Sequence, residues 1–114
     1  MSCALVLDPD GDIRVIDLSD GDTQQAMRAA IGCRAVDVVP LTTQLAMWLD
    51  GEGPVTQPRN PVATALACCY GRASQPCHGP AVLAGVGGDG GTVNLTSDQA
   101  LAVLCHLNDA LDGA

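Results

Sequence analysis

The chain of 114 residues contains no phenylalanine and no lysine, and it has only one tryptophan and one tyrosine. Hydrophobic residues nevertheless make up 47% of the sequence, so the chain has enough apolar material to fold. Its core must therefore be built mainly from aliphatic side chains. A length of this order predicts one domain that spans residues 1–114.

Positive charge is scarce in this sequence. Five arginines are set against 13 acidic residues, which gives a formal net charge of −8. A chain with this charge repels phosphate backbones and lacks the basic patch of a nucleic-acid-binding protein. We therefore expect no direct contact with DNA or RNA. The excess of acid fits ordinary solubility, and the alternative is a nucleic-acid mimic that occupies a basic groove on a partner.

Long hydrophobic runs are also missing. No run approaches the roughly 18 apolar residues of a membrane-spanning helix, so we expect no contact with a membrane. The apolar run Ala4–Leu7 is too short for the core of a signal peptide, and no basic residue precedes it. The sequence therefore predicts a cytoplasmic protein.

The cysteines lack the paired spacing of a zinc site, in which two of them are separated by two to four residues. Without a signal peptide we expect reduced thiols, and those in apolar helices are expected to act as small buried hydrophobes. A neighbouring cysteine and histidine do not by themselves place a thiolate beside a base. We therefore expect no enzyme and no cofactor. The alternative is a small metal-binding or thiol-dependent enzyme that draws on Cys68, Cys69, Cys77, His78, Cys105 and His106.

Two loops resemble ligand-binding motifs but lack essential parts of them. Asp8, Asp10 and Asp12 are spaced like the start of a calcium loop, yet the glycine and the glutamate that such a loop requires are misplaced or missing. The glycine run at residues 87–91 lacks the Lys-Ser/Thr pair of a phosphate loop. Both segments are therefore interpreted as turns of β-hairpins.

The stretch from Ile31 to Leu66 organises the rest of the chain. Residues 34–39 alternate with period two and predict a strand, which Pro40 is expected to end. The apolar run Leu45–Leu49 predicts a buried strand, and the Gly- and Pro-rich residues 50–54 predict a turn.

A helix is predicted directly after this turn. Asn60 is a favourable N-cap, Pro61 suits the first helical position, and Gly71 is a natural stop. The spacing of the apolar residues predicts that one face of this helix carries Val62, Leu66, Cys69 and Tyr70.

The remaining segments predict a hairpin, a helix, a second hairpin and a final helix. The expected ranges are 4–7 and 13–18, 24–31, 81–86 and 92–95, and a helix from Thr96. Thr96 and Gln99 form a capping box. The last helix is expected to bury a stripe of Ala100, Leu104, Leu107 and Leu111, which Leu101 and Val103 widen. The expected fold class is α+β: a mostly antiparallel sheet of hairpins, covered by two to three helices on one face.

Several short motifs in this order resemble an uncharacterised family, domain of unknown function 3846. They are Ile31-Gly32, Val38-Val39-Pro40, Ala46-Met47-Trp48 followed by Asp50-Gly51-Glu52-Gly53, Pro58-Arg59-Asn60, and Leu95-Thr96-Ser97-Asp98-Gln99. The resemblance implies a gene found in bacterial chromosomes, plasmids or phages. It implies no activity.

Trp48 and the polar residues that follow it are the candidate binding site: Trp48, Asp50, Glu52, Arg59 and Asn60. Trp and Arg are frequent anchors at protein interfaces. Each also has a structural interpretation: Trp48 as core, Asn60 as cap, and the two acids as turn residues. We expect a small acidic non-enzymatic protein of a phage, plasmid or integrated element that binds a host or element-encoded protein.

Overall fold

The computed structural model describes residues 3–18, 23–33, 35–52, 57–71, 76–87 and 91–112. Its elements are β1 (Ala4–Leu7), β2 (Ile13–Ile16), α1 (Thr23–Ile31), β3 (Val36–Pro40), β4 (Leu45–Asp50), α3 (Pro61–Cys69), β5 (Ala81–Val86), β6 (Thr92–Val93) and α4 (Ser97–Asp112). The order of strands and helices predicted from the sequence is confirmed. Among the described residues, no helix combines the length and the apolar character that crossing a membrane requires.

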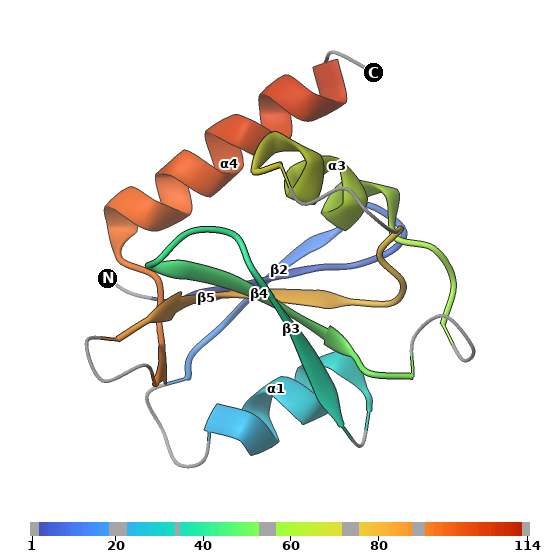
Figure 1. The fold of residues 1–114 in the computed structure, drawn as a ribbon, viewed down its shortest axis with the longest axis vertical. Coiled ribbons are helices and arrows are strands. Elements are labelled where there is room, and N and C mark those ends of the chain that lie inside the picture. The colour runs from blue at the N-terminus through green and yellow to red at the C-terminus, as the bar shows by residue number, and fades with distance from the viewer. Residues whose placement is uncertain are drawn as a thin grey trace.

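The strands form one antiparallel sheet in the order β2-β1-β5-β4-β3, and the short β6 pairs with the end of β5 (Figure 1). The strand β5 lies in the middle of the sheet. Its residue Leu83 pairs with Leu5 of β1 on one side and with Met47 of β4 on the other. The predicted α+β class is confirmed.

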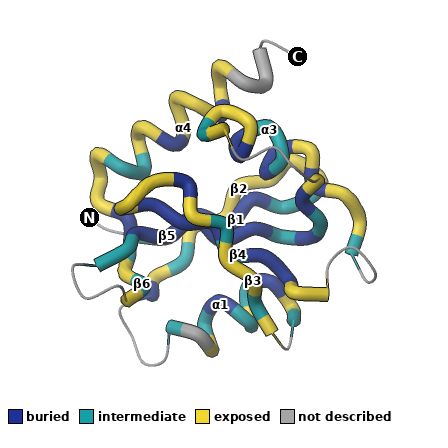
Figure 2. The backbone as a smooth tube through the Cα atoms, in the orientation of Figure 1, coloured by how far each residue is buried: buried dark blue, intermediate teal, exposed yellow. Residues whose placement is uncertain are grey.

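The helices cover both faces of this sheet, so the expectation that they share one face was wrong. On one face α3 and α4 pack over Leu7, Met47 and Leu83, whereas α1 packs over Val6 and Val82 on the other (Figures 1 and 2). The runs ALVL and AVLAG are buried at every position because alternate side chains enter opposite cores. Such continuous apolar strands require a cover on each side.

The strand β3 ends at Pro40, as the sequence predicted, and Pro40 itself is the last residue of the ladder. Gly51 N donates to Ala35 O at one end of the β3–β4 ladder, and Leu41 N donates to Leu45 O at the other. Hydrogen-bonded and non-hydrogen-bonded pairs alternate along such a ladder. Pro40 therefore occupies a position whose backbone groups point away from β4, to the open side of the sheet. The missing N–H of proline is tolerated there.

The start of α4 confirms the predicted capping box. Thr96 Oγ1 accepts a hydrogen bond from Gln99 N at 3.1 Å, and Gln99 Oε1 accepts one from Thr96 N at 2.9 Å. These two bonds satisfy N–H groups that the first helical turn leaves without a backbone partner.

The apolar stripe of α4 differs from the expected one. Leu107 is buried and Ala100 packs partly against the core, but Leu104 is 41% exposed. Val103, which was expected only to widen the stripe, is fully buried. Successive helical residues are rotated by about 100°, and the rotation of α4 turns Val103 rather than Leu104 to the core. The side chain of Leu111 lies outside the described residues.

Candidate functional site

The structure brings four of the five predicted site residues to one end of the sheet, where β4 ends and α3 begins. Gln57 Nε2 donates to Asp50 Oδ2 at 3.2 Å and so connects the turn after β4 with the segment that leads to α3. Exposure then separates the residues: Glu52 and Arg59 are exposed, whereas Asp50 is 9% exposed and Asn60 is 0% exposed. Trp48 lies two residues before this end, on the α1 side of β4.

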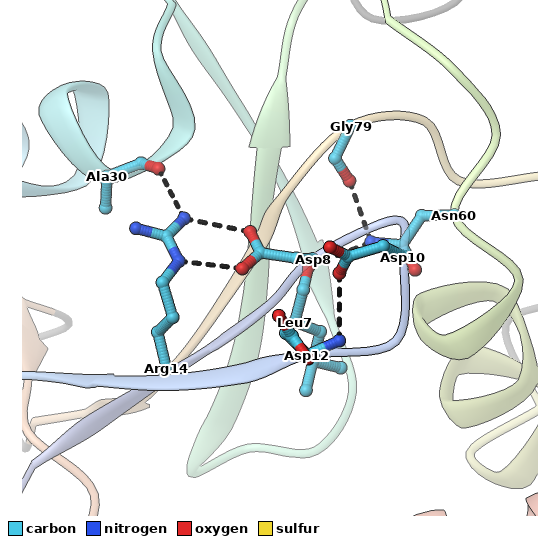
Figure 3. A network of polar contacts seen from close by, with 8 residues as sticks. All are labelled: Leu7, Asp8, Asp10, Asp12, Arg14, Ala30, Asn60 and Gly79. Carbon is cyan, nitrogen blue, oxygen red and sulfur yellow. Dashed lines mark hydrogen bonds and ion pairs between the residues drawn. The ribbon is translucent and has the colours of Figure 1, made fainter.

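Asn60 joins three separate parts of the fold. Its Nδ2 donates to Leu7 O at 2.9 Å and to Gly79 O at 2.8 Å (Figure 3). Its Oδ1 accepts from Ala63 N at 3.0 Å. The last bond confirms the predicted N-cap of α3. The two bonds from Nδ2 were not predicted. They hold the end of β1 and the segment just before β5 against the start of this helix. The side chain makes three internal hydrogen bonds and is 0% exposed, so it offers no surface to a partner.

Asp50 and Trp48 also serve the fold. Asp50 Oδ1 accepts from Glu52 N at 2.8 Å, which is the turn role expected of an aspartate in this position. Trp48 packs on the core beneath α1, directly opposite Val38 in the β3–β4 register. Of the five candidates, only Glu52 and Arg59 are exposed to solvent.

Arg59 has a neighbour that the sequence did not reveal. Arg59 and His78 form an isolated antiparallel bridge, flanked by hydrogen bonds from Asn60 N to Cys77 O and from Gly79 N to Pro58 O, each 2.8 Å long. This pattern defines a non-hydrogen-bonded pair, in which the two side chains leave the backbone on the same side and close together. The Cβ atoms of Arg59 and His78 therefore lie close together on one side of this bridge.

The acidic loop after β1 is organised by turn and ion-pair contacts. Both carboxylate oxygens of Asp8 accept from Arg14, at 2.8 Å from Nε and 2.9 Å from Nη2, and Nη2 also donates to Ala30 O (Figure 3). The hydrogen bond to Asp8 raises the pKa of Arg14. Asp10 Oδ1 accepts from Asp12 N. Within the described ranges, no group of three or more His, Cys, Asp or Glu side chains is arranged to hold a metal ion.

The six cysteines are all free, but their burial differs from the expectation. Cys68, Cys69 and Cys105 are exposed on the helices, whereas Cys77 is buried. Burial raises the pKa of the Cys77 thiol, and Thr64 opposes that rise. Burial also raises the pKa of the half-buried Cys33 thiol, and the nearby charge of Asp50 adds to it.

These environments predict a clear order of thiol reactivity. Because the thiolate is the reactive form, a raised pKa slows alkylation at neutral pH, and burial slows it further. In timed labelling with iodoacetamide, read by mass spectrometry of peptides, we expect Cys68, Cys69 and Cys105 to react first and Cys77 last. All six should react at similar rates in denaturant. Labelling of Cys77 as fast as Cys105 in the native protein would contradict this order.

The most exposed apolar strand lies away from the predicted site. The first three residues of β2 are exposed, whereas Ile16 packs partly against the core (Figure 2). Ile13 and Val15 are 43% and 65% exposed. They pair with the buried Leu7 and Leu5 on the face that α3 and α4 cover, but at β2 they stay exposed to solvent. We call Ile13–Ile16 the β2 edge, because no strand within the described ranges pairs with its outer side. This exposure could not be predicted from the sequence, because the same alternation is typical of a strand with one buried face.

Comparison with known protein families assigns most of the chain to one family. The model of the family described as Domain of unknown function (DUF3846) matches residues 1–108. The chain belongs to this family. The resemblance inferred from the short motifs is thereby confirmed. No curated protein and no solved structure matches the chain.

The residues that carried the DUF3846 resemblance have structural roles in this fold. Pro40 lies on the open side of β3, Asp50 forms the turn after β4, and Asn60 joins α3 to β1 and β5. At Gly51, an added Cβ would lie 3.4 Å from Ala35 O, so the turn packs closely against the start of β3. These motif residues thus have structural explanations, whereas Glu52 and Arg59 of the same motifs are exposed.

Proposed function

We propose that this protein is a small acidic, non-enzymatic binding module of a phage, plasmid or integrated element. It acts in the cytoplasm by contacting a host or element-encoded protein. The gene context is supported by membership of the family, which is an argument by association. The protein-binding role is supported by one structural observation, the open β2 edge with its two exposed apolar side chains.

The two edges of the sheet are built differently. At β3, Pro40 occupies an outward-pointing position without an N–H, and Asp37 places a charge on the edge strand. Proline and charge are common means of preventing unwanted strand pairing. At β2 the solvent-facing residues include Ile13 and Val15, and neither proline nor a free cation interrupts the strand, because Arg14 is engaged by Asp8. An edge left open and apolar favours the addition of a strand from another protein.

A capture experiment tests this proposal. The tagged protein is added to a lysate of the native host, retained proteins are identified, and each is purified and tested again. We expect a partner that binds the wild type, binds the Val38→Ser control on the opposite edge, and is lost with the double variant Ile13→Ser/Val15→Ser. Equal retention of every candidate partner by all three proteins would contradict a role for the β2 edge.

The segment predicted from the sequence is tested in the same experiment. Arg59 is exposed, so Arg59→Ala should change the free energy of unfolding by no more than about 0.5 kcal/mol. Weaker capture by this folded variant would include the Arg59 segment in the interface. Full capture would remove it and leave the β2 edge as the binding surface.

A further inference from the structure

We propose that the β2 edge accepts an extended segment of the partner that is apolar at alternate positions and carries Lys or Arg at both ends. The segment joins the sheet as a further strand beside β2. This inference rests on the protein-binding role proposed above. The backbone register, the exposed side chains and the distribution of charge each specify one property of this segment.

The backbone register shows which groups are available for pairing. Asp8 N donates to Asp12 O at 2.9 Å, next to the pair Leu7–Ile13. Since hydrogen-bonded pairs alternate with non-hydrogen-bonded pairs, Ile13 and Val15 do not bond to β1. Their N–H and C=O groups point to the open side of the sheet. These groups recur at every second residue, about 6.6 Å apart, which is the spacing that an added strand requires.

The side chains define where the segment must be apolar. Ile13 and Val15 have outward backbone groups and are also the exposed apolar residues of the strand. An added strand would therefore place every second side chain directly beside them, and contact between apolar side chains across strands stabilises such a pair. The side chain of Arg14 does not interfere, because its guanidinium is bound to Asp8 and to Ala30 O.

The charges define the ends of the segment. Asp10 and Asp12 are exposed just before β2, and Asp17 is exposed just after it. The Asp17 carboxylate also accepts a hydrogen bond from Asn94 Nδ2, and Asp17 is exposed with this bond in place. Carboxylates thus flank an apolar strand at both ends, in a chain with a net charge of −8. A basic segment is attracted to such an edge, whereas a second copy of this chain would bring the same negative charge.

Synthetic peptides provide the test. The probe is a labelled peptide of nine residues, in which two Lys at each end flank a centre of five alternating Val and Thr. Its counterpart carries Glu in place of each Lys. In fluorescence anisotropy we expect the basic peptide to bind at least roughly tenfold more tightly than the acidic one. Raising NaCl from about 50 mM to about 500 mM should weaken binding. Bound peptide should also slow amide exchange at Ile13 and Val15.

Matched variants locate the site. Val15→Pro removes an outward N–H that β1 does not use, and Val38→Pro removes the corresponding outward group at β3. The first should weaken peptide binding by roughly tenfold or more and the second should not. Val15→Lys with its control Val38→Lys repeats the test without changing the backbone, in case a proline variant does not fold. The repulsion from the lysines of the peptide should again weaken binding only at β2.

Three results would overturn the proposal: no preference for the basic peptide, wild-type binding by both Val15 variants, or no peptide binding at all. A dimer in sedimentation, with exchange protection at Ile13 and Val15 before any peptide is added, would instead assign the edge to a second copy. These outcomes are distinct from the capture result. Loss of a purified partner with Ile13→Ser/Val15→Ser, together with failure of the basic peptide, would retain protein binding at β2 and reject only the chemistry of the segment.

Discussion

Asn60→Ala is expected to lower the free energy of unfolding by roughly 3 kcal/mol, which is more than the loss of a helix cap alone. Removal of an N-cap typically costs about 0.5–2 kcal/mol. In this protein the substitution also leaves the carbonyl oxygens of Leu7 and Gly79 without their donor in a fully buried site. Each buried group that loses its partner adds about 1 kcal/mol or more. Urea unfolding followed by circular dichroism measures the difference.

Asn60→Asp separates the two contributions. Aspartate caps helices about as well as asparagine, so a residue that served only as a cap would tolerate the change. The carboxylate cannot donate to Leu7 O and Gly79 O, and it places negative charge beside both carbonyl oxygens. We therefore expect Asn60→Asp to be at least as destabilising as Asn60→Ala at neutral pH. Wild-type stability of the aspartate variant would show that the two bonds from Nδ2 contribute nothing.

Leu107→Ala should destabilise the protein by about 2–5 kcal/mol, because it opens a cavity in the core. Leu107 is 3% exposed and packs in the core on the α3 and α4 side of the sheet. At about 4–8 °C for each kcal/mol in a small domain, the melting temperature should fall by about 8 °C or more.

Leu104→Ala is the matched control on the same helix. It deletes the same atoms from a side chain that is 41% exposed, so its effect should stay below about 1 kcal/mol. Comparable losses for the two variants would contradict the observed rotation of α4 and would support the stripe predicted from the sequence. Thermal unfolding of both variants under one set of conditions decides between the two arrangements.

Features set by neighbouring residues were predictable from the sequence. The capping box of Thr96 and Gln99 and the cap formed by Asn60 depend on residues three positions apart, and both are present. The long-range bonds of Asn60 were not predictable, because Leu7 O is brought to it only by the assembled sheet. The placement of α1 on the opposite face of the sheet was not predictable for the same reason, because it also depends on the assembled fold. Its amphipathic pattern identifies a buried side but not the sheet face that buries it.

The candidate site shows the same limit. Sequence reasoning found the segment around Trp48 and Arg59 but could not separate buried residues from exposed ones. Asp50 and Asn60 proved to be internal, and Arg59 gained His78 as a neighbour only through the fold. The exposure of Val15 was missed because alternation indicates two faces without showing whether a helix covers either. That information lies in the lengths and positions of other elements.

The central position of β5 has a consequence for how the chain assembles during synthesis. The hairpins β1–β2 and β3–β4 are complete early in the sequence, but the register joins Leu5 and Met47 only through Leu83. Contacts between residues so far apart in sequence form slowly, because a long stretch of chain must first be ordered. Until β5 leaves the ribosome, each hairpin has a free inner edge that the finished sheet hides. The time between the synthesis of β4 and that of β5 is therefore when this chain is most exposed to aggregation and to chaperones.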